Sequence, residues 1–396
     1  MRTRHFLGIW LIMILVAGCG QKPTRAPETL PPAPDLVRTP APIADHTNKM
    51  GIYLLLDDGR KHWPVERWAE HLRAAREIVG EWGFVVQLVR LDDLDAAKWQ
   101  QFMDLCAALE LTPVIRLATV YDQMAGYWIA PPQDADRTYR GVAQQYADFI
   151  TALEWPTDEH WVIVGNEPNQ GGEWGGKPDA AAYARFLIDV ADTLHAVDPG
   201  ARVLNGALDP YAPHTGDVAL ANGAMLLDAE TFMDRMTAAY PGVWARIDVW
   251  ASHSYPTGPF RNPPTDQTFQ IDLINGAVNP AHDTPPEGIY NRGVQGYEWE
   301  LFKLAALGAP TLPVLITETG WRHAETVNPG AADGGDDLPD AATVAGYLDQ
   351  AWGVWGTDAR VVGVVFFALD GNPAAWGHSN WLMVDERGRV VGRYYR

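Results

Sequence analysis

From Met50 onward, two hydrophobic patterns alternate along the chain. Short runs of consecutive apolar residues, typical of strands buried on both faces, occur at 51–56, 84–90, 113–118, 161–167, 201–208, 247–255, 312–318 and 361–369. Between them an apolar residue recurs every three or four positions, which predicts helices over 65–82, 97–110, 138–154, 179–197, 229–240, 289–307 and 340–355. Eight strands alternating with helices predict an α/β fold, the (β/α)8 TIM barrel.

The end of the chain departs from an ideal barrel. The last predicted strand is followed by two short apolar segments, 381–384 and 389–395, that flank Asp385-Glu386-Arg387-Gly388. This pattern is typical of a hairpin, so we expect the eighth helix to be missing or replaced by a C-terminal hairpin. A doubly wound open sheet is the alternative fold, but no glycine-rich GxGxxG turn follows the first predicted strand.

The N-terminus has the pattern of a secretion signal. Arg2 and Arg4 precede an apolar run over 6–16, which is too short to span a bilayer. Val16-Ala17-Gly18-Cys19 resembles the lipobox of bacterial lipoproteins. That resemblance implies cleavage of residues 1–18 and a lipid anchor on Cys19. An ordinary secretion signal with a chance cysteine is the alternative.

The segment 19–48 has no apolar periodicity and contains seven prolines. We interpret it as an extended tether between the lipid and a single catalytic domain over 49–396. The protein is then expected in the bacterial cell envelope, facing the periplasm or the exterior, as a monomer. The sequence leaves open whether the inner or the outer membrane holds it.

Composition narrows the choice of partners. The net charge of −20 argues against binding nucleic acid or an anionic membrane surface. The 17 tryptophans supply aromatic faces that can stack on sugars. No HxH or HExxH spacing occurs, and the acidic run at 333–337 lacks EF-hand spacing. We therefore predict no metal and no cofactor, and Cys106, in a helical pattern, is expected to be a buried thiol.

Two glutamates follow buried apolar runs. Glu167 comes directly after Trp161-Val162-Ile163-Val164-Gly165-Asn166, and Glu318 comes after Val314-Leu315-Ile316-Thr317. Residues at the C-terminal ends of barrel strands form the active face, and glycoside cleavage requires two carboxyl groups, one as acid and one as nucleophile or base. The alternative for each glutamate alone is a carboxylate that caps the following helix.

Several segments resemble motifs of the clan A glycoside hydrolases, barrel enzymes with catalytic glutamates after strands four and seven. Asn166-Glu167-Pro168 resembles the acid/base motif, and Thr317-Glu318-Thr319-Gly320-Trp321 resembles the nucleophile motif. His253-Ser254-Tyr255-Pro256, at the end of the sixth strand, resembles the histidine and tyrosine positions, and Arg90 resembles the arginine that holds the nucleophile. The resemblance covers residues 50–390 and implies double-displacement cleavage of β-linked glycans.

The resemblance also implies roles around the two glutamates. Asn166 is expected to bind the sugar 2-hydroxyl, Tyr255 and Arg90 to orient Glu318, and His253 to contact the substrate. Arg116, which ends the third strand, is an equal candidate for the arginine. Among the tryptophans at positions 128, 174, 321 and 376, Trp321 is the best candidate for a sugar platform.

One position departs from the clan's pattern. The eighth strand reads Val364-Val365-Phe366-Phe367-Ala368-Leu369-Asp370 and lacks the tryptophan that usually ends it. Trp376 and Trp381 are candidates for folding back to replace it. The main functional hypothesis is a lipid-anchored retaining glycoside hydrolase acting on an oligo- or polysaccharide. The alternatives are a glycan-binding lipoprotein with an inactive barrel and a transglycosidase that uses the same residues.

Overall fold

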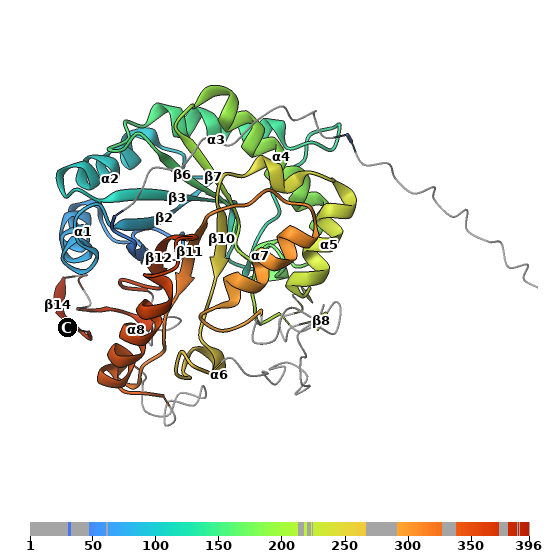
Figure 1. The fold of residues 1–396 in the computed structure, drawn as a ribbon. Helices are drawn as coiled ribbons and strands as arrows, with labels where there is room; N and C mark the ends of the chain where they lie inside the picture. The colour runs from blue at the N-terminus through green and yellow to red at the C-terminus, as the bar shows by residue number, and fades with distance from the viewer. Residues whose placement is uncertain are drawn as a thin grey trace, which may run out of the picture.

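The computed structural model describes residues 31–32, 47–60, 62–212, 218–219, 223, 225–266, 291–326, 338–371, 379–385, 387 and 389–395. Eight parallel strands form one sheet in the order β10-β11-β12-β1-β2-β3-β6-β7. They are β1 (Met50–Leu54), β2 (Phe84–Arg90), β3 (Thr112–Ala118), β6 (His160–Val164), β7 (Ala201–Asn205), β10 (Trp250–His253), β11 (Val314–Thr319) and β12 (Val361–Phe366). Figure 1 shows these strands inside a ring of helices.

The sheet closes between its two edge strands, β7 and β10. Leu204 and Val249 form a parallel bridge there, and the Asp248 amide donates to the Val203 carbonyl at 2.9 Å. The Asn205 side chain spans the rest of the seam, because it accepts from the Ala251 amide at 2.9 Å and donates to the Ala251 carbonyl at 3.2 Å. A side-chain amide thus replaces backbone pairing where the strands separate, and the predicted (β/α)8 barrel is confirmed.

Helices connect successive strands and cover the outside of the barrel. They are α1 (Val65–Val79), α2 (Ala96–Ala108), α3 (Arg140–Ala152), α4 (Ala180–Val197), α5 (Ala229–Ala239), α7 (Gly296–Ala306) and α8 (Ala341–Trp355). The loops add one turn, α6 (Thr257–Phe260), and three 3-10 helices, η1 (Gly171–Glu173), η2 (Val243–Arg246) and η3 (Ala324–Thr326). The sequence pattern did not predict two short hairpins, β4–β5 (Tyr121–Asp122, Tyr127–Trp128) and β8–β9 (Val218–Ala219, Met225–Leu226).

The core has two layers, because alternate strand residues face opposite sides of the sheet. Inside the barrel lie residues such as Tyr53, Trp161 and Leu315. Their strand neighbours, such as Ile52 and Ile316, pack outward against the helices. Cys106 on α2 is buried in this outer layer, as predicted.

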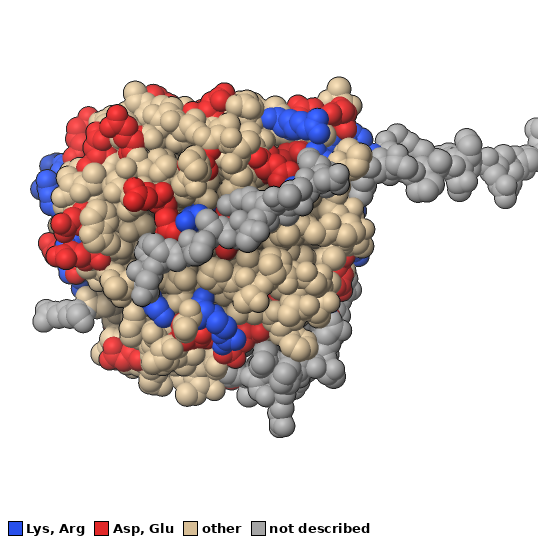
Figure 2. All heavy atoms as spheres, turned by 45° about the horizontal axis from the view of Figure 1, so that its top comes forward, with Lys and Arg blue, Asp and Glu red and all other residues tan. Residues whose placement is uncertain are grey.

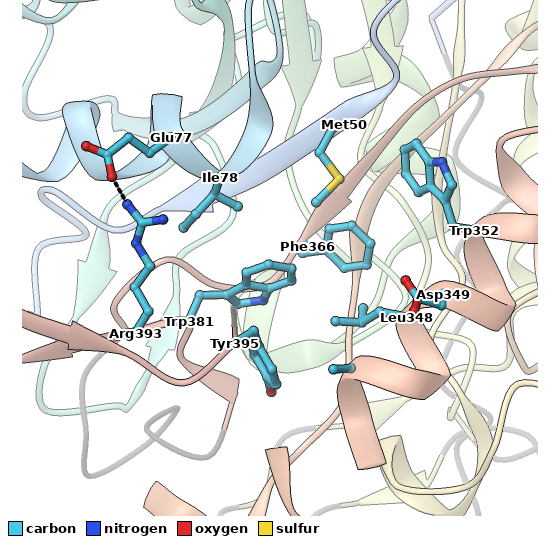
Figure 3. Close-up of a pocket in the computed structure, with 11 residues that line it drawn as sticks. Met50, Glu77, Ile78, Leu348, Asp349, Trp352, Phe366, Trp381, Arg393 and Tyr395 are labelled. Carbon is cyan, nitrogen blue, oxygen red and sulfur yellow. Dashed lines mark hydrogen bonds and ion pairs between the residues drawn. The ribbon is translucent and has the colours of Figure 1, made fainter. Parts of the chain in front are cut away.

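The expected C-terminal hairpin is present as β13 (Leu382–Val384) and β14 (Val390–Arg393). It lies beside α1 and α8, where a barrel's last helix would pack (Figure 1). The hairpin leaves a groove of about 430 Å³, lined by α1, α8, Phe366, Trp381 and Tyr395 (Figure 3). Arg393 bonds to Glu77 across it. No helix follows β12 in the part of the chain that the structure describes.

Little of the predicted tether belongs to the described residues, and Cys19 lies outside them. Pro31 and Pro32 are described, and the Pro32 carbonyl accepts a hydrogen bond of 2.6 Å from Arg185 on α4. Carboxylates are prominent over the face shown in Figure 2, in keeping with the acidic composition. Within the described ranges, no helix has the length and apolar character needed to cross a membrane.

Candidate active site

Glu167 follows the end of β6 and lies at the mouth of the barrel. Gly165 has φ +85° and Glu167 has φ +35°, left-handed values that cost energy for a residue with a side chain and often mark functional sites. The Gly165 amide donates to the Leu117 carbonyl at 3.0 Å, and the Glu167 amide donates to the Ala207 carbonyl at 2.8 Å. The ends of the two neighbouring strands therefore hold the backbone that carries Glu167.

A glycine makes this close packing possible. A Cβ on Gly206 would lie 2.8 Å from the Asn166 amide nitrogen and 3.0 Å from the Val164 carbonyl oxygen. Since a real Cβ does not approach backbone atoms so closely, any side chain at position 206 would push the Asn166–Glu167 turn away from β7.

Glu318 reaches the same mouth because β11 is irregular. Leu315 faces the barrel interior and Ile316 faces the helices, so simple alternation would turn residue 318 outward. The register between β10 and β11 instead shifts by one residue, and His253 pairs with Glu318. This bulge points the Glu318 carboxyl inward.

Two side chains from β10 and its end connect the glutamates. His253 Nδ1 lies 2.8 Å from Glu167 Oε1, and its Nε2 lies 3.8 Å from Glu318 Oε1. The Tyr255 hydroxyl donates to Glu318 Oε2 at 3.0 Å. One imidazole ring therefore separates the two carboxyl groups, which share a pocket of about 320 Å³. We call this the barrel-top pocket.

A second carboxyl group lies close to Glu167. The Gln170 amide nitrogen donates to Glu167 Oε2 at 2.8 Å and to Asp209 Oδ2 at 2.9 Å. Burial raises the pKa of Glu167 well above its ordinary value, and the charge of Asp209 raises it further. Burial also raises the pKa of Asp209. Glu167 is thus suited to hold a proton at neutral pH.

Glu318 has neighbours that favour its ionised form. Burial raises the pKa of Glu318 and the charge of Glu167 adds to the rise, but Arg116 and the Tyr255 hydroxyl favour the ionised form. Burial lowers the pKa of His253, so its ring is neutral near pH 7. The two glutamates therefore differ in environment, which is how enzymes separate an acid from a nucleophile.

Three further polar side chains line the barrel-top pocket beside the glutamates: Asn166, Arg116 and Glu173. The Asn166 side chain hydrogen-bonds Glu173, whose pKa burial raises to about 7 although Arg116 opposes the rise. Asn166 thus lies beside Glu167 in the lining of the barrel-top pocket.

The structure separates the two arginine candidates. Arg90 pairs with Asp57 and Asp92, both at 2.9 Å, and does not belong to the pocket lining. Arg116 faces Glu318 instead. Leu88, not Arg90, is its register partner, so Arg116 lies about 6–7 Å deeper in the barrel than Arg90. Arg116 therefore lies in the barrel-top pocket, and Arg90 lies outside its lining.

Trp321 is a buried packing residue in this structure. Its indole nitrogen donates to the Asn262 carbonyl at 2.8 Å, and its ring packs against Tyr347 and Trp355. Trp174 is likewise buried against Tyr183. These rings serve the packing around the barrel, so neither lines the barrel-top pocket.

Aromatic residues other than the expected tryptophans line the barrel-top pocket. Phe367, at the end of β12, lines the barrel-top pocket and packs against Tyr53 with ring centroids 5.3 Å apart. Trp381 does not fold back, because its ring packs outside the barrel on Phe366 and Tyr395. Trp376 lies outside the described residues. Trp128 lines the pocket from the β4–β5 hairpin.

The sequence reasoning missed Asp209, Gln170 and Glu173. A signal existed for Asp209, which directly follows the predicted strand 201–208, and for the other two, which lie in the glycine-rich loop after Glu167.

For metals, the described residues contain no group of three or more His, Cys, Asp or Glu side chains that could hold an ion. The acidic run at 333–337 lies outside them.

No family model matches the chain, and no curated protein sequence matches it. Solved structures do match. A fungal β-1,4-galactanase shares 15% identity over 81% of this chain and 87% of its own, with a TM-score of 0.50. The chain shares its barrel fold with this galactanase. Two other glycosidases also match. A GH128 endo-β-1,3-glucanase from Sorangium cellulosum shares 14% identity over 86% of this chain and 94% of its own, with a TM-score of 0.46. A β-glucosidase from Trichoderma harzianum shares 13% identity over 91% of this chain and 97% of its own, with a TM-score of 0.49. At 15% identity, the similarity to the galactanase shows a shared fold and nothing finer.

Proposed function

We propose that the chain is a retaining glycoside hydrolase that cleaves β-linked glycans. The observation that carries this proposal is the meeting of Glu167 and Glu318 in one pocket, on either side of the His253 ring. Retention requires carboxyl groups about 5–5.5 Å apart, whereas inversion requires about 6.5–9.5 Å to admit a water. The resemblance of Asn166-Glu167-Pro168 and Thr317-Glu318-Thr319-Gly320-Trp321 to clan A motifs supports the shorter distance and a covalent intermediate.

In the first step, a Glu318 carboxylate oxygen forms a bond to the anomeric carbon while the bond to the leaving oxygen breaks. Glu167 transfers its proton to that oxygen, so the leaving group departs as an alcohol. The Tyr255 hydroxyl, 3.0 Å from Glu318 Oε2, orients the nucleophile. Asn166 is positioned to bind the sugar 2-hydroxyl, a contact that strengthens toward the transition state.

In the second step, water attacks the same carbon and releases Glu318. Glu167, now ionised, accepts a proton from that water. Two inversions leave the configuration unchanged. If a sugar hydroxyl replaces water, the same residues perform transglycosylation.

The location of the enzyme is part of the proposal. The lipobox-like Val16-Ala17-Gly18-Cys19 and the proline-rich segment after it support a barrel held at the bacterial cell envelope by lipid on Cys19. The acidic composition argues against electrostatic attachment of the barrel itself to an anionic membrane surface. We propose that the barrel acts there as a monomer.

A panel of aryl β-glycosides and β-glucans, mannans and galactans tests the function on the tether-free barrel. A 2-fluoro glycoside with a good leaving group should form a stable ester on Glu318, found by peptide mass, and Glu318→Gln should be inactive. Glu300→Gln is the matched control, because Glu300 is also buried but bonds to Trp250 outside the pocket. Binding of glycans without any cleavage or labelling would refute the proposal and favour a glycan-binding protein.

A further inference from the structure

Arg116 is a buried cation with no ion-pair partner among the residues that the structure describes. It is 6% exposed, lines the barrel-top pocket, and its Nε atom has no hydrogen-bond partner in the described part of the chain. Its guanidinium carbon lies 5.9 Å from the Tyr53 ring centroid, near the outer limit of a cation–π contact. The carboxyl groups of Glu173 and Glu318 face it, yet neither forms an ion pair with it.

Other buried arginines of the described chain are paired. Arg185 contacts Asp189 through two nitrogens, at 2.9 and 2.5 Å, and Arg202 contacts Glu159 at 2.9 Å. A desolvated charge without a partner costs several kcal/mol, and a guanidinium stays protonated at any ordinary pH. Arg116 therefore presents hydrogen-bond donors to the pocket that no described side chain pairs with as an ion pair.

A second guanidinium lines the same pocket nearer solvent. Arg60 is paired with Asp58 at 3.0 Å and lies over the rings of Tyr121 and Trp128, at 5.2 and 5.9 Å. Both arginines act on Glu173, so the three side chains lie near one another. Because the pKa of Glu173 is raised to about 7, this carboxyl is partly neutral at physiological pH, which limits its repulsion of an incoming anion.

We propose that the pocket accepts a hexuronic acid residue and that Arg116 binds the carboxylate of that sugar. The proposal rests on the glycosidase function above and names its substrate class. A guanidinium presents parallel N–H donors that match the two oxygens of a carboxylate, and Trp128 offers a flat apolar wall for the ring of the sugar. A neutral sugar would offer only hydroxyls to this charge.

Matched substrates test the assignment: an aryl β-glucuronide with its β-glucoside, and an aryl β-galacturonide with its β-galactoside. Wild-type kcat/KM should favour at least one uronide over its neutral partner by about 10- to 100-fold, the range for a hydrogen-bonded charge. Arg116→Gln should abolish that preference, and Arg116→Lys should retain part of it. Equal rates on both members of each pair, with Arg116→Gln slowing both alike, would overturn the uronic acid assignment and leave the glycosidase function standing.

A binding arm keeps the test independent of turnover. An acidic oligosaccharide should bind Glu318→Gln at least ~10-fold more tightly than its carboxyl-reduced counterpart, and Arg116→Gln in that background should remove the difference; equal affinities would overturn the assignment. Arg185→Gln is the folding control. It should lower the melting temperature by leaving the buried Asp189 without its ion-pair partner, whereas Arg116→Gln removes no ion pair and should not lower it.

Discussion

Asp209 should set the upper pH limit of activity through its effect on Glu167. The Gln170 amide nitrogen lies 2.8 Å from Glu167 Oε2 and 2.9 Å from Asp209 Oδ2, so these oxygens are at most 5.7 Å apart. Two unit charges at that distance repel each other by about 3 kcal/mol at an effective dielectric constant of 20. This repulsion opposes ionisation of Glu167 while Asp209 is charged and so raises the pKa of Glu167.

The substitution Asp209→Asn removes this repulsion and keeps an oxygen that can accept from Gln170. Because burial alone still raises the pKa of Glu167, the pKa should fall without returning to its ordinary value. Glu167 must be protonated to act as an acid, so activity is present below its pKa and is lost as pH rises through it. The alkaline limb of kcat/KM should therefore move to lower pH.

The assay is the pH profile of kcat/KM for two substrates with the same sugar. The shift should be full for a glycoside with a poor leaving group, which needs the proton. It should be small for a dinitrophenyl glycoside, whose first step needs none. Glu300→Gln, which removes a buried carboxyl outside the pocket, should leave both profiles unchanged. An unmoved alkaline limb in Asp209→Asn, or an equal shift for both substrates, would refute the coupling between Asp209 and Glu167.

Two further predictions address the acid/base and the anchor. Glu167→Ala should slow glycosides with poor leaving groups far more than activated aryl glycosides. Added azide should restore turnover and give the β-glycosyl azide from a β-glycoside, whereas the inverted α-azide is expected from Glu318→Ala. Equal slowing of all substrates with no azide product would show that Glu167 is not the acid/base. Cys19→Ser should abolish labelling of cells by a fatty-acid analogue and release the protein from the membrane fraction; absence of label on the wild type would exclude the lipoprotein hypothesis.

Much of the fold could be predicted because its strands are buried on both faces. Each barrel strand began within three residues of an apolar run, and the hairpin that replaces the last helix was visible as two short runs around Asp385-Glu386-Arg387-Gly388. Most strands ended earlier than the patterns suggested. Residues such as Tyr255 and Ala207 remain apolar and buried beyond their strands because they line the mouth of the barrel.

The details of the site depend on geometry that a single sequence does not contain. Alternation from Leu315 predicts an outward Glu318, and only the register shift in β11 turns it inward. Arg90 and Arg116 both lie near strand ends, but their depth follows from the pairing of Arg116 with Leu88. Asp209 and Gln170 come from different loops, and their meeting with Glu167 requires the closed barrel.

The neighbours of the two glutamates determine which one is protonated and which one is ionised. Both are desolvated at the mouth of the barrel, so burial alone would raise the pKa of each and leave no ionised nucleophile. On one side of His253, Asp209 adds a negative charge and keeps the proton on Glu167. On the other side, Tyr255 donates a hydrogen bond and Arg116 supplies a positive charge, which favour ionised Glu318. If a substrate carboxylate pairs with Arg116, the positive charge of Arg116 stabilises the Glu318 carboxylate less. Tyr255 then becomes the main group that keeps the nucleophile ionised. Tyr255→Phe should then impair hydrolysis of a uronide more than hydrolysis of its neutral partner, and kcat for the two substrates measures the difference.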